Sequence, residues 1–343
     1  MINSKKNILV TGGAGFIGSH TAVELFQSGY HPVIVDNLST SDRLLLEGLS
    51  KITGEKVDFF EGDCTDREFL KSVFSKRSIS AVMHFAAFKS VGESVEHPLR
   101  YFRNNIDSLI VLLEVMKEFG VRDFIFSSSC TVYGQPEIIP VNEMAPFRKA
   151  ESPYGATKQI GEQILEASID SGFRVVSLRY FNPVGAHPTG HIGELPVGVP
   201  NNLVPYITQT AAGVRKSLTV FGNDYDTADG SCIRDFIHVV DVARAHVKAL
   251  EYLWSIESES NSFEAFNLGT GLGVSVLELI KSFETSNQLS LNYTIGARRP
   301  GDVVKVYADP SKIMKAMGWK PDFSLEEAMI HAWNWQKKIS NIK

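Results

Sequence analysis

This chain of 343 residues lacks both a cysteine framework and a long apolar run. Its three cysteines lie far apart, at Cys64, Cys130 and Cys232. Three scattered thiols exclude a disulfide scaffold, and neither they nor the nine histidines show the paired spacing of a metal site. No apolar stretch approaches the roughly 18 residues of a membrane-spanning helix, so no membrane partner is expected.

The chain also lacks a large excess of charge of either sign. Its formal net charge is −5, with 21% charged and 43% hydrophobic residues. This balance is typical of an ordinary soluble globular protein and argues against a nucleic-acid partner. The apolar residues 8–10 that follow two N-terminal lysines are too few for a signal-peptide core, so we expect a cytoplasmic protein.

Glycines stand where a dinucleotide site needs them. The apolar residues 8–10 are predicted to form a strand that runs into Gly12, Gly15 and Gly18 and then into an amphipathic helix over 16–28. Gly12 permits a tight turn, Gly15 lets the backbone approach a pyrophosphate, and Gly18 favours close packing of helix on strand. The helix would present free N–H groups and its positive dipole end to the phosphates.

An acidic residue completes this unit. Asp36 ends a second predicted strand and follows Gly12 by 24 residues, near the spacing of an acid that hydrogen-bonds the adenosine ribose. A carboxylate there would repel the 2′-phosphate of NADP, so NAD(H) is favoured. The alternative is that Asp36 is a solvated turn residue.

Strand-like and helix-like segments alternate in the first half of the chain, a pattern typical of a parallel sheet covered on both faces. The alternation stops at 182–235, which is rich in proline, glycine and asparagine. The sequence therefore predicts an α/β fold, a Rossmann-type doubly wound parallel sheet with a smaller mixed α/β substrate-binding domain. The sheet domain is expected at 1–181 plus about 236–268, and the second at about 182–235 plus 269–343. Strands are expected at 7–11, 32–36, 57–61, 81–86, 123–128, 174–179 and 264–268, and helices at 16–28, 41–52, 66–76, 99–119, 154–171 and 239–253.

Small and polar residues follow several predicted strands, at the sheet edge where ligands of such folds bind. An acid after the third strand could contact an adenine ring, and small residues after the fourth would allow approach to a nicotinamide ribose. Three serines follow the fifth strand; they could simply end it and cap a helix, but a catalytic role is favoured. These segments contain Asp63, Cys64, Phe85, Ala86, Ala87, Lys89, Ser127, Ser128 and Ser129.

Tyr154 and Lys158 are spaced four apart and should share one helix face. A free phenol has a pKa near 10, and a neighbouring ammonium together with a positive nicotinamide ring would favour the phenolate. Lowering the pKa to about 7 takes roughly 4 kcal/mol. The alternative is an ordinary tyrosine–lysine pair on an exposed helix. With the dinucleotide turn and the serines upstream, proton abstraction by Tyr154 is favoured, with Ser129 orienting a substrate hydroxyl.

The segment from Thr11 to Gly18, together with Ser129, Tyr154 and Lys158, resembles the extended short-chain dehydrogenases/reductases. More narrowly, the chain resembles the UDP-glucose 4-epimerase family from Lys6 to about Trp335. The longer segments that carry this resemblance are 84–94, 179–187, 200–205, 221–225, 234–239 and 298–302.

The resemblance implies a redox-neutral inversion at C4 of a UDP-hexose through a 4-keto sugar, with NAD retained as cofactor. Tyr154, Lys158 and Ser129 would be catalytic, and no metal is implied. The cofactor site is expected to comprise Gly12, Gly15, Phe16, Ile17, Gly18, Asp36, Asn37, Asp63, Cys64, Phe85, Ala86, Ala87, Lys89, Asn104, Tyr154, Lys158 and Phe181. The substrate site is expected to comprise Asn182, Asn202, Leu203, Phe221, Arg234, Arg299, Asp302 and Val306.

Other functions remain open on the same scaffold. Nucleotide-sugar 4,6-dehydratases carry an Asp-Glu pair before a Val-Tyr-Gly segment, and the decarboxylases keep the Glu; this chain has Cys130 and Thr131 there. A non-catalytic NAD-binding protein would be free to lose Tyr154 or Lys158. The chain also departs from the family at Cys130, Phe236 and Thr40, where alanine, tyrosine and asparagine are usual.

The resemblance also implies a substrate range and a subunit arrangement. A bulky tyrosine at the fourth position after Asp302 would restrict the pocket to glucose and galactose forms. This chain has Val306 there, which predicts room for the N-acetylated pair as well, unless Val306 is simply a packed strand residue. A homodimer is expected through the helices at 99–119 and 154–171.

Overall fold

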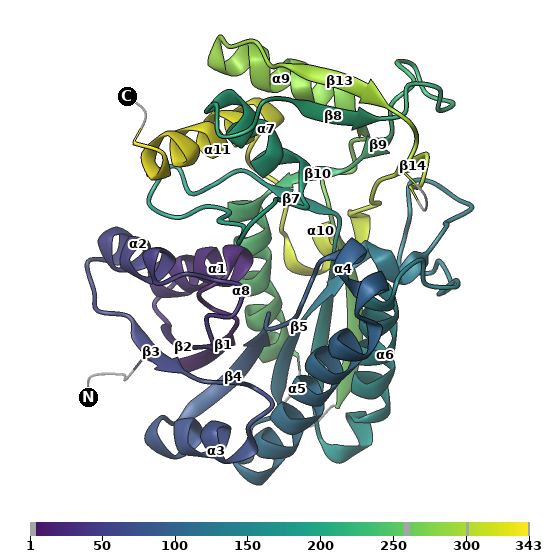
Figure 1. Cartoon of the computed structure of the whole chain (residues 1–343). Coiled ribbons are helices and arrows are strands. Elements are labelled where there is room, and N and C mark those ends of the chain that lie inside the picture. Colours follow the sequence, from purple (N-terminus) through teal and green to yellow (C-terminus); the bar gives the residue numbers. More distant parts are fainter. Residues whose placement is uncertain (1–4, 257–260, 300–301, 342–343) are drawn as a thin grey trace.

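In a computed structural model, which describes residues 5–256, 261–299 and 302–341, a seven-stranded sheet forms the centre of the molecule (Figure 1). Every strand pairing in it is parallel, and the order is β11-β6-β5-β4-β1-β2-β3. The Rossmann-type doubly wound sheet is therefore confirmed. Its strands are β1 (Asn7–Thr11), β2 (His31–Asp36), β3 (Asp58–Glu61), β4 (Ile79–His84), β5 (Asp123–Ser129), β6 (Arg174–Tyr180) and β11 (Ser262–Leu268).

The two faces of this sheet are buried by separate groups of helices (Figure 1). Successive residues of a strand point to opposite faces. Ile8 and Val10 accordingly join the core cluster that contains α1 and α8 side chains, whereas Leu9 joins the cluster under α3 and α5. The first group is α1 (Phe16–Gln27), α2 (Arg43–Thr53) and α8 (Val239–Ser255), and the second is α3 (Arg67–Lys76), α5 (Pro98–Glu118) and α6 (Pro153–Ala167).

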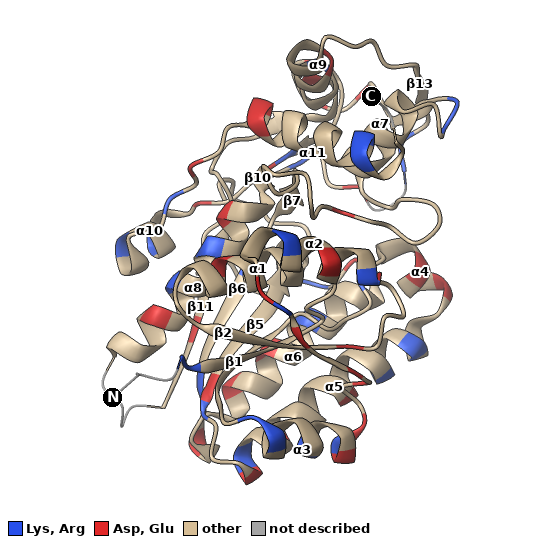
Figure 2. Ribbon diagram, turned by 90° about the vertical axis from the view of Figure 1, so that its left-hand side faces the viewer, with Lys and Arg blue, Asp and Glu red and all other residues tan. Residues whose placement is uncertain are grey.

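The surface helices carry charges of both signs, as Figure 2 shows for α3 and α5, while the sheet between them is largely uncharged. Side chains cap the N-termini of several helices. Asp42 and Asp66, for example, accept hydrogen bonds from backbone N–H groups in the first turns of α2 and α3. α6 ends at Ala167, four residues before the predicted end, because a 3₁₀ turn, η2 (Ile169–Ser171), leads to Gly172 at a φ of 100°.

Most of the remaining elements form a second unit with its own core, whereas α4 and η1 pack against α6 of the sheet domain. That core joins side chains of α7, α9 and α11, including Ile207, Phe283 and Trp333. α10 instead packs on β11 and α8. The elements outside the main sheet are α4 (Val91–Glu96), η1 (Cys130–Tyr133), β7 (Asn182–Val184), α7 (Leu203–Ala211), β8 (Leu218–Phe221), β9 (Ile233–Arg234), β10 (Phe236–His238), β12 (Val274–Ser275), α9 (Val276–Asn287), β13 (Tyr293–Gly296), β14 (Lys305–Val306), α10 (Ser311–Met317) and α11 (Leu325–Ile339).

The second unit lies above the carboxyl ends of the main strands (Figure 1). Three small sheets, β10-β7, β12-β9-β14 and β13-β8, connect its segments. β1 lies between β2 and β4, so the strand order reverses at β1 and β4, where ligands bind in open parallel sheets. No helix among the described residues is both long and apolar enough to cross a membrane.

Candidate functional site

The turn after β1 is built by two glycines that tolerate no side chain. A Cβ on Gly12 would lie 2.6 Å from the Ala86 backbone nitrogen, and the φ of Gly12 is +70°. A Cβ on Gly18 would lie 2.3 Å from the Gly12 oxygen. The turn therefore brings α1 against β1 and the β4 loop, with the Phe85 N–H donating to the Thr11 oxygen at 2.9 Å.

The third glycine faces a different environment. A Cβ on Gly15 would meet only the Gly12 oxygen, at 3.1 Å. Gly15 is also the N-cap of α1, so no side chain caps the helix, and the first turn, which includes Phe16, Ile17 and Gly18, holds no acidic residue. Open N–H groups at a helix start, with no Cβ in front of them, suit a pyrophosphate. The residues present therefore fit the dinucleotide that the sequence predicts.

Asp36 ends β2 beside this turn and is 7% exposed, so it is not a solvated turn residue. Its Oδ2 accepts a hydrogen bond from the Ala14 N–H at 3.0 Å, and its Oδ1 accepts from the Leu38 N–H and the Ser41 hydroxyl. The carboxylate is held rigidly one strand away from Gly12, where the 2′-hydroxyl of a bound ribose is expected.

Asn37 and Asp63 lie side by side at the ends of β2 and β3. The Asn37 side-chain amide donates to Asp63 Oδ2 at 2.9 Å. Burial alone would raise the pKa of Asp63, but hydrogen bonds from Thr65 and Asn37 outweigh it and lower the pKa. The neighbouring Cys64 is buried in the core cluster under α3 and α5, and burial raises the pKa of its thiol.

Tyr154, Lys158 and Ser129 converge at the carboxyl end of β5. Lys158 is 5% exposed, and its Nζ donates to the backbone carbonyl oxygen of Ser127 at 2.6 Å. The same Nζ lies 5.8 Å from the centre of the Tyr154 ring. A hydrogen bond joins the side chains of Ser129 and Tyr154. The predicted catalytic set is therefore brought together by β5 and the first two turns of α6.

Burial dominates the ionisation of this group. It raises the pKa of Tyr154 to about 12, and the hydrogen bond from Ser129 only partly offsets this. Burial also lowers the pKa of Lys158 to about 8, against the charge of Glu162, which raises it. The sequence predicts a lowered phenol pKa; in the protein alone the direction is the opposite, because desolvation of the phenolate outweighs the hydrogen bond from Ser129.

A buried ion pair fixes α6 on the sheet, and the sequence reasoning missed it. The Arg179 guanidinium forms an ion pair with Glu162 at 2.6 Å, and Glu162 Oε1 also accepts from the Ser128 and Ser177 hydroxyls. Glu162 lies four residues after Lys158, as Lys158 does after Tyr154, so this spacing could have placed Glu162 on the same helix face. Because α6 also carries Tyr154 and Lys158, the Arg179–Glu162 ion pair helps to fix the position of these two residues relative to the sheet.

The β4 loop is fixed to the same helix by a second missed residue. The Asn105 side chain accepts from the Phe88 N–H at 2.9 Å and donates to the Phe88 oxygen and the Thr157 hydroxyl. The predicted Asn104 donates to Asn105 at 2.9 Å. This network carries Ala87 and Lys89, which follow β4, toward α6.

The predicted substrate residues fall into two groups. In the first, Asp302 Oδ1 accepts from Arg299 at 2.8 Å and lies 3.6 Å from the Arg234 guanidinium. The Arg299 guanidinium lies 5.7 Å from the centre of the Phe221 ring, which is 45% exposed. Val306 pairs with Arg234 between β14 and β9. Pro300 and Gly301 of the matching segment lie outside the described residues.

The second group spans the two units. Asn182 follows the buried Phe181 at the end of β6 and donates its backbone N–H to the Asp235 oxygen. Asn202 and Leu203 begin α7, and the Asn202 amide donates to Glu194 at 2.6 Å. Nothing in the local sequence around Glu194 marks it as part of the site.

Two of the three positions that depart from the family pattern lie in dry surroundings, whereas Thr40 is exposed. Cys130 packs against the cluster that contains Val306, and burial raises the pKa of its thiol to about 12. Phe236 is a buried core residue of the second unit, where an apolar ring needs no polar partner.

Comparison with known proteins gives matches over nearly the whole chain. A family model described as GDP-mannose 4,6 dehydratase matches residues 9–331. The chain is 50% identical over 336 residues to a UDP-glucose 4-epimerase of Bacillus subtilis (strain 168), covering 97% of this chain and 98% of that protein.

Solved structures agree. A crystal structure of UDP-glucose 4-epimerase from Bifidobacterium longum in complex with NAD+ and UDP superposes with a TM-score of 0.93 and 44% identity, covering 98% of this chain and 100% of that one. The structure of a UDP-Glc/GlcNAc 4-epimerase from Campylobacter jejuni gives a TM-score of 0.82 and 36% identity, with coverage of 97% and 99%.

Proposed function

The chain belongs to the UDP-glucose 4-epimerase family, and from that membership we propose that it is an NAD-dependent isomerase that interconverts UDP-glucose and UDP-galactose by inverting C4. The observation that carries this function is the convergence of Ser129, Tyr154 and Lys158 at the carboxyl end of β5, in the same sheet whose β1 leads into the Gly12–Gly18 turn. NAD bound at the turn would accept the C4 hydride and return it.

Tyr154 is the proton carrier of the proposed reaction. Ser129 holds the sugar O4, and Tyr154 accepts the O4 proton as C4 becomes a ketone. The 4-keto sugar then turns over, receives the hydride on its other face and takes the proton back from Tyr154, so atoms and electrons balance. Because burial raises the pKa of Tyr154, positive charge must favour its ionised form, and Lys158 supplies part of it.

Arginines and a phenyl ring would hold the UDP. A guanidinium matches the oxygens of a diphosphate and stays charged. Arg234 is held by the Ile233 and Val303 oxygens, so its position is fixed before a ligand arrives. The exposed face of Phe221 suits the uracil ring. The proposed UDP-hexose site comprises Asn182, Asn202, Leu203, Phe221, Arg234, Arg299 and Asp302.

The dehydratase alternative lacks its acid and base. Loss of the C6 hydroxyl needs a group that protonates the leaving oxygen and one that deprotonates C5. Cys130 stays a neutral thiol, and the Thr131 hydroxyl is buried without a hydrogen-bond partner among the described residues. The retained Tyr154 and Lys158 equally disfavour a protein that merely binds NAD.

The substrate range is proposed to include UDP-GlcNAc and UDP-GalNAc. Val306 stands beside Arg234 in register and belongs to a cluster with Val132 and Phe181, next to Cys130. A valine in that wall takes less space than a tyrosine would, which supports room for an N-acetyl group. Against this, Val306 is only 9% exposed.

A cytoplasmic homodimer is proposed for the assembled protein. Leu99 is 81% exposed and Ile110 is 39% exposed on α5, which packs on α6. Apolar side chains on that helix pair suit a subunit interface. Unpaired thiols at all three cysteines suit a reducing compartment.

The decisive experiment is incubation of the purified protein with UDP-galactose, followed by NMR of the sugar. We expect UDP-glucose to form to equilibrium with no net NADH. Steady accumulation of NADH would instead identify a dehydrogenase, and loss of the 6-hydroxyl a dehydratase.

A further inference from the structure

The Glu194 carboxylate joins the cofactor side of the site to the substrate side. Its Oε1 accepts hydrogen bonds from Lys89 Nζ at 2.9 Å and from Asn202 Nδ2 at 2.6 Å. Lys89 follows β4 in the main sheet, and Asn202 precedes α7 in the second unit. A single oxygen therefore sets the distance between two groups that belong to different halves of the site.

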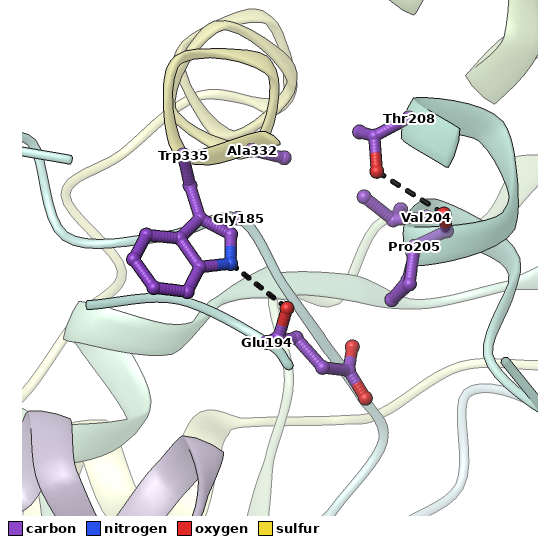
Figure 3. A pocket seen from close by; sticks show the side chains of 7 residues that line it. All are labelled: Gly185, Glu194, Val204, Pro205, Thr208, Ala332 and Trp335. Atoms are coloured by element: carbon purple, nitrogen blue, oxygen red, sulfur yellow. Dashed lines mark hydrogen bonds between the residues drawn. The ribbon is translucent and has the colours of Figure 1, made fainter. Parts of the chain in front are cut away.

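The backbone of Glu194 is fixed before any ligand arrives. Ala186 and Gly193 form an antiparallel bridge, and a Cβ on Gly193 would lie 2.4 Å from the Trp335 ring. The Trp335 indole N–H donates to the backbone carbonyl oxygen of Glu194 at 2.9 Å. Figure 3 shows the indole on one side of Glu194 and the carboxylate extending away from it. These contacts fix the backbone from which the Glu194 carboxylate extends.

Asn202 gives up its usual role for this contact. Asparagine at an N-cap normally accepts a hydrogen bond from an N–H of the first helical turn. The Asn202 side chain makes no such bond, and its amide is directed to Glu194 instead. The first turn of α7 therefore keeps N–H groups that no side chain caps, beside the amide that is expected to meet the UDP-sugar.

Lys89 depends on the same oxygen. Its side chain is 61% exposed, whereas that of Glu194 is 11% exposed. A long exposed lysine samples many rotamers unless a partner holds it, and ordering it costs entropy. Glu194, anchored by Trp335, is the group that orders it.

We propose that Glu194 is a positioning residue that orients Lys89 and Asn202 together and so couples the cofactor side to UDP-sugar binding. This inference rests on the proposed epimerase function. Glu194 touches neither reacting atom; it acts through its two donors.

The test compares Glu194→Ala and Glu194→Gln in the holoenzyme. We expect Glu194→Ala to lower kcat/KM for UDP-galactose by about 10–100-fold, as misplaced binding groups do, and to weaken UDP binding measured by calorimetry. Glu194→Gln keeps an oxygen acceptor and should restore most of both. Glu251→Ala removes an exposed carboxylate paired with Lys248 and is the control, with unchanged activity.

A double-mutant cycle separates positioning from a structural role. In a Lys89→Met, Asn202→Ala background, adding Glu194→Ala should change kcat/KM and UDP affinity by less than about twofold, because the coupled partners are gone. The thermal midpoints of both Glu194 variants should stay near that of the control. An unchanged UDP affinity and kcat/KM in Glu194→Ala, an equal loss in the background, or failure of rescue with a lowered midpoint would each overturn the inference. If the wild type does not turn over UDP-galactose, the proposed function fails, while the cycle in UDP affinity still decides the role of Glu194.

Discussion

The two ends of the proposed site differ in how far their polar groups are removed from water. At the Tyr154 end, Lys158 is 5% and Ser129 8% exposed. Burial there raises the pKa of Tyr154 and lowers the pKa of Lys158. At the uridine end, Phe221 is 45% exposed and the Arg299 side chain 58%. A dry end makes each group indispensable, because a desolvated charge has few substitutes. A wet end distributes binding over several groups, each of which water can partly replace.

The largest effect is expected at the dry end. Tyr154→Phe removes the proton acceptor but keeps the ring, so folding and NAD content should survive. Loss of a general base costs about 10²–10⁴-fold in kcat. NMR-monitored conversion of UDP-galactose measures this. Turnover near that of the wild type would show that Tyr154 is not the base.

Val306 lies between the two ends, in register with Arg234 and in the cluster against which Cys130 packs. Its replacement tests whether this part of the pocket wall limits the size of the sugar. Val306→Tyr should suppress turnover of the N-acetylated pair selectively, by about 10–200-fold, because one pocket wall discriminates by roughly 1–3 kcal/mol. UDP-glucose and UDP-galactose should be affected little, which makes them the internal control. The proposed range is wrong if the wild type shows no activity on the N-acetylated pair.

Arg234 and Arg299 form a matched pair at the wetter end. The Arg234 side chain is 17% exposed and is held by two backbone oxygens, whereas Arg299 is 58% exposed. Arg234→Ala should weaken UDP binding by about 10–100-fold, as loss of a charged hydrogen bond does. Arg299→Ala should weaken it by only about twofold to fivefold. Calorimetry with UDP compares them, and equal losses would remove the distinction drawn between the partly buried and the exposed arginine.

The pH response of the dry end is expected to be no larger than the losses at Tyr154, Val306 and Arg234. Burial lowers the pKa of Lys158 to about 8, so its positive charge is present below that pH and is lost above it. kcat/KM should therefore be flat near neutrality and fall as the pH rises through about 8, by about tenfold at pH 9. A flat pH–kcat/KM profile to pH 10 would show that the Lys158 charge is not required.

Much of the sheet domain and its site followed from local sequence. The strand, glycine turn, helix and Asp36 lie within a few dozen residues, and Tyr154 and Lys158 share a helix face, so their spacing alone predicts their neighbourhood. Resemblance, not local pattern, supplied the substrate residues. The domain bounds and the role of each site residue stay predictions.

Long-range contacts were beyond that reasoning. Glu194 and Lys89 are 105 residues apart in the chain, and no periodicity links a loop carboxylate to a lysine at that distance. Arg234 and Val306 become neighbours only through the pairing of β9 and β14. Such contacts depend on how two units pack against each other.

The sequence by itself determined a doubly wound sheet, a cofactor turn and a tyrosine–lysine pair, because strand and helix periods and glycine chemistry are local. The tertiary structure alone decided that burial raises the pKa of Tyr154, that Glu162 and Arg179 fix α6, and that Glu194 joins the two sides of the site. Burial and desolvation arise only when distant segments close over a group, and no stretch of sequence carries them.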